Sequence, residues 1–341
     1  LFLPIVLTLA SIGTSLTLWV GGQGVMKGAV SYGVLAAFIS YTIQFFEPVR
    51  ELARIFAELQ AAHASAERVM SLLSTEPEIQ DRSDVLNNHW PPMKGTIRFE
   101  DVSFAYNPQE PVLTEFNLHV EAGQTIALVG ETGSGKSTIA NLACRFYEPT
   151  SGQVFIDGVD YRERPLSWLH SNLGYVLQSP QLFSGTIMEN IRYGRLKASD
   201  HEVIEGAKLV NAHPFIMKLP KGYQTEVGEG GGLLSTGEKQ LISFARAVLA
   251  NPRLFVLDEA TSSIDTETEQ LIQEAIHTVL AGRTSFVIAH RLSTIRSADQ
   301  ILVIRDGRIQ EQGTHSQLMK RKGYYYRLYT NQFLEEQSQT I

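Results

Sequence analysis

Gly130–Glu131–Thr132–Gly133–Ser134–Gly135–Lys136–Ser137–Thr138 is the stretch that decides the fold of this chain. The apolar run Thr125–Val129 precedes it and predicts a buried strand, and Ile139–Cys144 follows it with a helical pattern. A strand, a glycine-rich turn and a helix form the context that a phosphate-binding loop requires. The glycines let backbone N–H groups converge on an anion, and the helix N-terminus adds partial positive charge. We therefore expect this loop to bind nucleotide phosphates, with Lys136 reaching the β- and γ-phosphates and Ser137 ligating Mg²⁺.

The charges of the chain are unevenly distributed. Its 341 residues, enough for two domains, carry a net charge of −7, and neither residues 1–26 nor residues 28–46 contain Asp, Glu, Lys or Arg. The acidic balance argues against a nucleic-acid partner, which would require a basic surface. The single cysteine, Cys144, excludes an internal disulfide and a multi-cysteine metal site.

The first 75 residues predict an all-α transmembrane segment. Leu1–Val20 is an uncharged run of 20 residues and Ala29–Phe46 is a second run of 18, each long enough to cross a bilayer as a helix. Soluble helices of this length normally carry a charged face, so a membrane hairpin is favoured over a pair of core helices in a soluble protein. Three arginines, Arg50, Arg54 and Arg68, follow the second run, and the positive-inside bias places residue 50 onward in the cytoplasm.

Helical spacing of apolar residues continues beyond the second apolar run. It predicts one long helix from Val34 to Leu73, about 60 Å in length, that leaves the membrane. A polar, proline-containing segment then predicts a linker, so that we expect a membrane region at 1–75, a linker at 76–95 and a second domain at 96–335. The chain begins with Leu1 inside an apolar run without a basic n-region, which indicates a fragment of a longer membrane protein.

Residues 96–335 predict an α/β domain of the P-loop NTPase class. The expected strands are Thr96–Phe104, Asn117–Val120, Thr125–Val129, Gln153–Ile156, Leu173–Leu177, Leu254–Leu257, Thr284–Ile288, Gln300–Ile304 and Arg308–Glu311. The expected helices are Lys136–Phe146, Thr186–Tyr193, Asp200–Val210, Gly237–Ala250, Thr268–Leu280 and Thr314–Lys320. Because strands and helices alternate, we expect a mainly parallel sheet with its ligand at the carboxyl ends of the strands.

Two adjacent carboxylates end the apolar run Leu254–Leu257. Asp258 at the strand end can hold Mg²⁺ through water, and Glu259 points to the other face because successive strand side chains alternate. Glu259 could accept a proton from an attacking water. The alternative is a surface Asp–Glu pair that caps a helix.

The residues between these landmarks resemble the nucleotide-binding domain of ATP-binding-cassette (ABC) transporters over nearly the whole domain. The resemblance implies that Tyr106 stacks on adenine, that Gln178 contacts Mg²⁺ and faces the membrane domain, and that His290 contacts the γ-phosphate. It also implies that Ser262–Asp265 lies at a dimer interface, with Asp265 in the D-loop. The expected ATP site therefore comprises Tyr106, Gly130, Glu131, Thr132, Gly133, Ser134, Gly135, Lys136, Ser137, Thr138 and Gln178, with Ser137, Gln178 and Asp258 toward the metal and Glu259 and His290 as catalytic residues.

The membrane hairpin narrows the resemblance to the exporter branch, in which six transmembrane helices precede the nucleotide domain on one chain. The two apolar runs resemble the fifth and sixth of those helices, which implies that about four helices precede this sequence in a multi-pass protein of the cell membrane. The nucleotide-binding domain would then be cytoplasmic.

The family signature reads Leu–Ser–Gly–Gly–Gln, whereas this chain has Leu234–Ser235–Thr236–Gly237–Glu238. In the family this segment contacts the γ-phosphate of ATP held by the other subunit, at a helix N-terminus. Thr236 adds a side chain and Glu238 adds a possible negative charge, and like charges a few ångströms apart repel by about 1 to 4 kcal/mol. Harmless drift is one explanation. The other is a weakened signature, which favours a heterodimer with a second half-transporter over a homodimer.

The sequence thus predicts an ATP-hydrolysing exporter subunit in the lipid bilayer, with ATP and Mg²⁺ as cofactors and no nucleic-acid partner. A soluble cassette ATPase without a transport role and a regulatory subunit that binds ATP without useful turnover are the alternatives. The apolar runs carry no charge that would indicate a cargo, so drug, lipid and peptide export all stay open.

Overall fold

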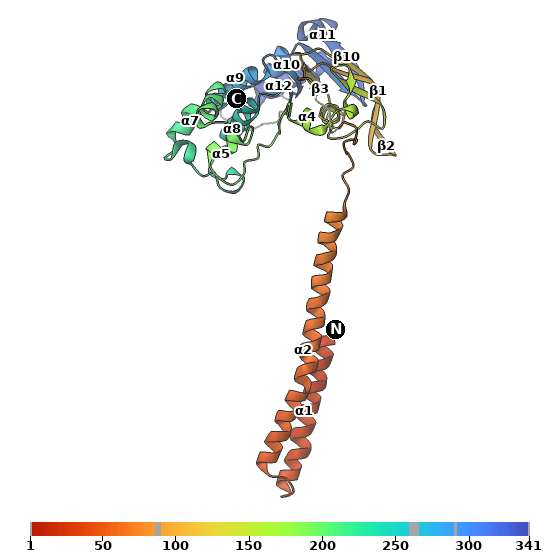
Figure 1. Ribbon diagram of the computed structural model, residues 1–341, viewed down its shortest axis with the longest axis vertical. Coiled ribbons are helices and arrows are strands. Elements are labelled where there is room, and N and C mark those ends of the chain that lie inside the picture. The colour runs from red at the N-terminus through yellow and green to blue at the C-terminus, as the bar shows by residue number, and fades with distance from the viewer. Residues whose placement is uncertain (1, 86–89, 259–265, 290–291, 340–341) are drawn as a thin grey trace. The chain divides into compact units, whose positions relative to one another are not determined.

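The computed structural model describes residues 2–85, 90–258, 266–289 and 292–339. The chain divides into two compact units, Leu1–Glu78 and Ile79–Ile341. The first contains two helices, and the second contains two sheets with the remaining helices (Figure 1).

The first unit is a helical hairpin, in which α1 (Phe2–Met26) lies along part of α2 (Tyr32–Ser74) (Figure 1). Small side chains allow this close packing. A Cβ placed on Gly21 would lie only 2.4 Å from Leu35 Cδ1, and the hydroxyls of Thr17 and Thr42 are 3.2 Å apart. Glycine and threonine four residues apart on one helix face are typical of helices that pack in a membrane.

Among the described residues one helix, at Pro4–Met26, is long and apolar enough to cross a membrane, and 6% of its most apolar stretch is buried. The second expected span, Ala29–Phe46, does not belong to a helix that is apolar enough over a sufficient length to cross a membrane. The physical reason is that α2 begins only at Tyr32 and meets its first charge at Glu47, which leaves an uncharged helical stretch shorter than the roughly 20 residues of a full span. The single long helix expected from Val34 to Leu73 is confirmed as α2, which has 43 residues.

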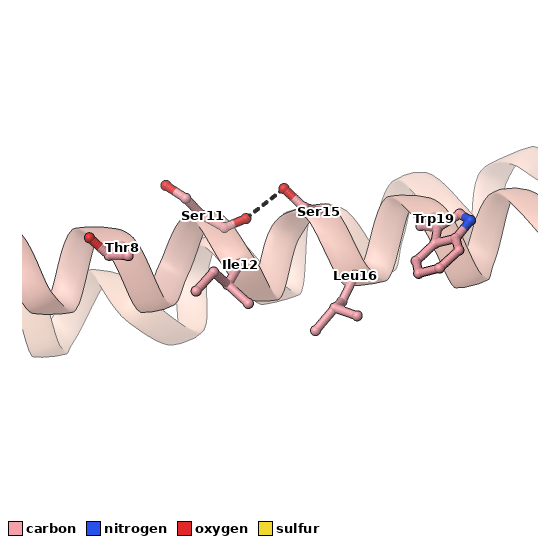
Figure 2. A pocket seen from close by; sticks show the side chains of 6 residues that line it. All are labelled: Thr8, Ser11, Ile12, Ser15, Leu16 and Trp19. Carbon is pink, nitrogen blue, oxygen red and sulfur yellow. Dashed lines mark hydrogen bonds between the residues drawn. The ribbon is translucent and has the colours of Figure 1, made fainter.

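One face of α1 carries hydroxyl groups beside large apolar side chains (Figure 2). A shallow pocket of about 460 Å³ on this face is lined by Thr8, Ser11, Ile12, Ser15, Leu16 and Trp19. The hydroxyls satisfy themselves within the helix, since Ser15 Oγ donates to the Ser11 carbonyl at 2.8 Å and Ser11 Oγ donates to the Leu7 carbonyl at 2.9 Å. Hydroxyls bonded in this way can face lipid without leaving an unsatisfied polar group.

The main sheet of the second unit has six strands in the order β10-β9-β3-β8-β7-β6. Their bounds are β10 (Arg308–Gly313), β9 (Gln300–Arg305), β3 (Thr125–Val129), β8 (Thr284–Ile288), β7 (Leu254–Asp258) and β6 (Leu173–Val176). All neighbours are parallel except β9 and β10. The expected mainly parallel sheet is confirmed.

The remaining strands form a separate antiparallel sheet, in the order β2-β1-β4-β5, so the expectation of one sheet was incomplete. Its strands are β2 (Glu110–Val120), β1 (Ile97–Asn107), β4 (Ser151–Ile156) and β5 (Val159–Asp160). In β1 buried residues alternate with more exposed ones, as in a sheet with one solvated face, whereas β7 and β8 are buried along almost their whole length. The apolar pattern of the sequence predicted the strands but did not indicate which strands belong to which sheet.

The α-helices of the unit are α3 (Lys136–Ala143), α4 (Leu166–His170), α5 (Ile187–Arg192), α6 (Asp200–Leu209), α7 (His213–Lys218), α8 (Thr236–Ala250), α9 (Thr266–Leu280), α10 (Leu292–Ser297), α11 (His315–Arg321) and α12 (Tyr324–Gln339). Some of them pack on the main sheet, such as α3 on β8 and α8 on β6, and others, such as α5 and α6, pack on α8. Successive residues of β3 join opposite cores, since Ile126 packs with the antiparallel sheet and α3 while Ala127 packs with the core that includes α8 and α9. The elements not expected from the sequence were β5, α4, α7, α10 and α12. Four of these are six residues or shorter.

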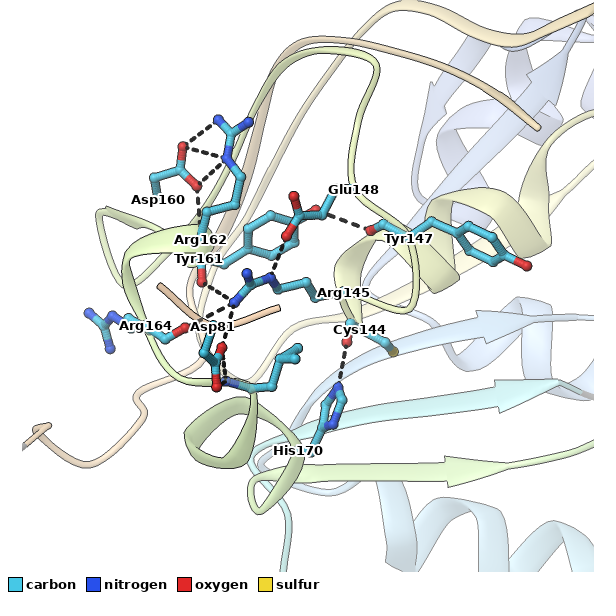
Figure 3. A network of polar contacts seen from close by, with 11 residues as sticks. Asp81, Cys144, Arg145, Tyr147, Glu148, Asp160, Tyr161, Arg162, Arg164 and His170 are labelled. Carbon is cyan, nitrogen blue, oxygen red and sulfur yellow. Dashed lines mark hydrogen bonds and ion pairs between the residues drawn. The ribbon is translucent and has the colours of Figure 1, made fainter. Parts of the chain in front are cut away.

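The segment that follows Glu78 is held on the second unit by a buried polar network (Figure 3). Arg145, whose side chain is 2% exposed, donates to Glu148 Oε1 at 2.8 Å and to the carbonyl of Arg164 at 2.9 Å, and forms an ion pair with Asp81 at 3.5 Å. Asp81 also accepts from the N–H of Leu166 at 2.9 Å, at the start of α4. Part of the segment expected as a linker is therefore bound to the α/β unit.

Candidate functional site

The glycine-rich loop joins β3 to α3, and at two of its glycines a positive φ is combined with close approach of neighbouring atoms. Gly130 has φ +154°, and a Cβ there would lie 2.2 Å from the carbonyl oxygen of Ile304. Gly135 precedes α3 with φ +103°, and a Cβ there would lie 3.0 Å from Leu113 Cδ2. Non-glycine residues rarely adopt such φ values, so the glycines of the motif are explained by backbone conformation and close approach.

Lys136 is buried at the first turn of α3, with 7% of the residue exposed. Its ammonium donates to the carbonyl oxygens of Gly130 and Glu131, both at 2.8 Å. Burial lowers the pKa of Lys136 from its ordinary value, and the negative charge of Asp258 opposes this shift. Because an ammonium has three N–H donors, one can be directed at a bound anion while both carbonyl bonds are kept.

A cavity of about 480 Å³ opens beside Lys136. It is lined by Tyr106, Val112, Thr132, Gly133, Gly135, Lys136, Ser137, Thr138, Gln178, Asp258 and Ile288. Gln178 follows β6, Asp258 ends β7 and Ile288 ends β8, so the cavity lies at the carboxyl ends of the parallel strands, where α/β sheets bind their ligands.

Tyr106 sits at the rim of this cavity near the end of β1. Its hydroxyl is 3.2 Å from Thr138 Oγ1, and its ring makes edge contacts with Phe104 and Tyr147 at centroid distances of 4.8 and 5.0 Å. The residue is 52% exposed. A half-exposed ring held by a hydroxyl bond and two T-shaped ring contacts can stack on a planar base.

Other members of the loop lie outside the cavity lining. Gly130, Glu131 and Ser134 belong to the loop but do not border the cavity. The hydroxyl of Ser134 is buried and has no hydrogen-bond partner among the described residues. A buried hydroxyl without a partner is costly, so Ser134 is a point of strain in the loop.

The donor set also fits Mg²⁺ in the form in which the ion usually binds beside nucleotides. No three His, Cys, Asp or Glu side chains gather into a metal cluster in the part of the chain that the structure describes. Mg²⁺ is normally held by one or two protein groups together with substrate phosphates and waters. Ser137, Asp258 and Gln178 border one cavity and supply oxygens of the kind that this ion prefers.

The segment Leu234–Glu238 does not border the cavity, and its side chains cap a helix instead. Ser235 is the N-cap of α8, where its Oγ accepts from the N–H of Glu238 at 3.2 Å and its own N–H donates to Glu238 Oε2 at 2.8 Å. This reciprocal capping box satisfies two N–H groups at the start of the helix. The Glu238 charge thus lies on the N-terminus of its own helix. The local pattern Ser-x-x-Glu before an apolar run is the sequence signal that could have predicted this capping box.

Three expected site residues, Glu259, Asp265 and His290, lie outside the described residues. The sequence reasoning missed two residues of the cavity, Val112 and Ile288. Ile288 could have been found, since it ends a strand that was expected with the same bounds as observed. Val112 lies in β2, and no local signal connects it to the loop.

Residues 113–262 match a protein family described as ABC transporter. An uncharacterized ABC transporter ATP-binding protein of Bacillus subtilis (strain 168) is 48% identical over 333 residues, which are 97% of this chain and 55% of that protein. A fatty acid ABC transporter ATP-binding/permease protein of Mycobacterium bovis is 48% identical over 90% of this chain and 48% of that protein. An ATP-dependent lipid A-core flippase of Syntrophus aciditrophicus is 44% identical over 98% of this chain and 55% of that protein.

Solved structures show the same relationship. A bacterial Atm1-family ABC exporter with ATP bound superimposes with a TM-score of 0.73 at 38% sequence identity, covering 96% of this chain and 56% of that chain. The chain therefore spans about half the length of the relatives that it matches.

Proposed function

We propose that this chain, whose Ile79–Ile341 unit is an ABC-type ATPase domain, is the ATP-driven part of a membrane exporter. The observation that carries the proposal is the cavity beside Lys136, where the loop, Gln178 and Asp258 meet at the carboxyl ends of parallel strands. The apolar helix α1, packed against α2, supports a link to the bilayer.

In this proposal the chain's own groups bind and orient MgATP. Lys136 and the backbone N–H groups at the start of α3 hold the phosphates, and the ring of Tyr106 stacks on the base. Ser137, Asp258 and Gln178 hold the metal with waters, and Mg²⁺ would neutralise charge that develops on the transferred phosphate. Because Lys136 is buried, its charge is less screened by water, and its attraction for the phosphates is stronger.

We assign hydrolysis to two residues outside the described part of the chain. Glu259 follows Asp258 directly and would accept the proton of the attacking water, and His290 would contact the γ-phosphate. Asp265 would lie at the interface of two ATPase domains, where ATP binding closes the pair and hydrolysis reopens it.

The test separates binding from chemistry. Lys136→Ala is expected to weaken nucleotide binding itself, because it removes the cation that meets the phosphates. Glu259→Gln is expected to leave the dissociation constant for ATP unchanged while hydrolysis falls by at least about 100-fold, the lower end for loss of a general base. Near-normal turnover of Glu259→Gln would refute the base assignment, and unchanged affinity of Lys136→Ala would refute the loop assignment.

For the assembly we propose a heterodimer with a second half-transporter. The supporting observation is Glu238, whose carboxylate occupies the helix N-terminus that the signature segment would offer to a partner's phosphate. Glu238→Gln keeps an oxygen acceptor for the Ser235 N–H while it removes the charge. It is therefore expected to raise the ATPase rate of any homodimer about fivefold, the equivalent of about 1 kcal/mol of repulsion in a water-screened site. A purified wild-type homodimer with full, transport-coupled activity would contradict the heterodimer.

A further inference from the structure

Glu131 joins the phosphate-binding lysine to the C-terminal helix. Its backbone carbonyl accepts a hydrogen bond from Lys136 Nζ at 2.8 Å. Its carboxylate Oε1 accepts a hydrogen bond from the hydroxyl of Tyr324 at 2.5 Å, across 193 positions of sequence. One residue of the loop is therefore bonded both to the cation of the site and to the first residue of α12.

Tyr324 is fixed by bonds that do not involve the loop. The carboxylate of Glu311 accepts from the N–H of Tyr324 at 2.5 Å and from the N–H of Tyr325 at 3.0 Å, and so caps the start of α12. The next side chain, Tyr325, is fully buried and its hydroxyl is 2.8 Å from His315 Nδ1. The Tyr324 hydroxyl is thus presented to Glu131 from an anchored helix end.

Two arginines lie beside the same tyrosine ring. The guanidinium carbons of Arg305 and Arg327 are 5.4 and 5.7 Å from the centroid of the Tyr324 ring. The hydrogen bond to Glu131 raises the pKa of Tyr324 above its ordinary value, so the hydroxyl stays protonated and remains a donor at neutral pH. These contacts orient the ring, and the hydroxyl then orients the carboxylate.

The direction of the Glu131 side chain matters because the loop is an anion site. Thr132 and Gly133, the next residues, border the cavity, whereas Glu131 does not. A carboxylate in the same loop that turned toward the cavity would repel the phosphates or compete with them for Lys136. The bond to Tyr324 holds the carboxylate outside the cavity lining.

We propose that Tyr324 is a positioning residue that keeps the Glu131 carboxylate out of the phosphate site, so that the start of the C-terminal helix sets the nucleotide affinity. The inference rests on the proposed role of the loop as an ATP site. The residue acts only through Glu131, and this dependence makes the proposal testable.

The experiment is a double-mutant cycle on the purified chain, with the dissociation constant for ATP measured by calorimetry. Tyr324→Phe keeps the ring and removes the hydrogen-bond donor. It is expected to weaken ATP binding about fivefold, which corresponds to the repulsion between two like charges about 4 Å apart when water screens them fully. Glu131→Gln is expected to bind ATP up to about twofold more tightly, since it removes the charge. Adding Tyr324→Phe to Glu131→Gln is expected to cause no further change.

Salt and a control variant complete the test. The defect of Tyr324→Phe should shrink in 0.5 M NaCl, because an exposed carboxylate is strongly screened at high ionic strength. Tyr326→Phe removes a hydroxyl from the same turn of α12 and is expected to bind ATP like the wild type.

The outcomes are separable. Wild-type affinity in Tyr324→Phe overturns the inference, and so does an equal defect in the presence and absence of the Glu131 charge, which would assign Tyr324 a purely structural role. If the wild-type chain itself binds no ATP, the proposed function of the loop fails and the inference fails with it.

Discussion

Replacing Arg145 with methionine is expected to destabilise the α/β unit far more than removing any exposed ion pair. The side chain of Arg145 is 2% exposed and has four acceptors around it. Besides Glu148, Asp81 and the carbonyl of Arg164, it donates to the carbonyl of Tyr161 at 3.2 Å (Figure 3). Methionine fills most of the same volume, so the loss is chiefly one of hydrogen bonds and charge.

The magnitude follows from the groups left behind. Removing one partner of a buried, charged network costs about 3 to 5 kcal/mol, because buried acceptors are left unsatisfied. In a domain of this size about 1 kcal/mol lowers Tm by 2 to 4 °C, so we expect Arg145→Met to lower Tm by about 10 °C. Asp81→Asn keeps an acceptor for the Leu166 N–H and loses an ion pair that is already 3.5 Å long, so its expected cost is only about 1 kcal/mol.

The assay is thermal unfolding followed by tryptophan fluorescence, and two of the three tryptophans, Trp90 and Trp168, lie beside Arg164 in this region. Trp168 stacks on Arg164 at 4.2 Å, and its Nε1 donates to the carbonyl of Pro91 at 2.9 Å. Arg82→Met is the matched control. Arg82 lies beside Asp81 in the chain, and its ion pair with Asp84 is exposed on both sides, so Tm should change by no more than about 2 °C. A Tm for Arg145→Met within about 3 °C of wild type would refute the reasoning.

Two further predictions concern the loop and the helix that follows it. Gly130→Ala is expected to destabilise the fold and abolish nucleotide binding, because its Cβ would lie 2.2 Å from the carbonyl oxygen of Ile304. Gly158→Ala is the control, since Gly158 also has a positive φ, +78°, but has open space around it. Equal behaviour of the two variants in thermal melting and ATP titration would contradict the steric argument. The only thiol, Cys144, is fully buried, and burial raises its pKa well above the ordinary value. Alkylation at pH 8, measured by mass spectrometry, is therefore expected to be at least about 100-fold slower in the native chain than in urea. Fast labelling of the native chain would contradict this expectation and show that α3 opens.

The sequence by itself determined the features that depend on neighbouring residues. The strands Thr125–Val129 and Thr284–Ile288 were expected with the bounds observed, because short apolar runs between turn residues are local signals. The phosphate loop was equally local, since a strand, glycines and a helix start are contiguous there. The capping box of Ser235 and Glu238 is also written in four adjacent positions, although the resemblance drew attention to the charge of Glu238 and away from its cap.

Only the tertiary structure decided which distant residues meet. An apolar strand must be buried, but its pattern does not name its neighbours, and in the main sheet β3 lies between β9 and β8. The sequence of the expected linker gave no sign that Asp81 would reach Arg145, 64 positions away. The loop motif likewise gave no sign that Glu131 would accept a hydrogen bond from Tyr324. Such contacts depend on the order of strands and the direction of the helices that carry the side chains. Hydrophobic periodicity states how deeply a segment is buried, whereas pairing across the fold depends on all segments packing at once.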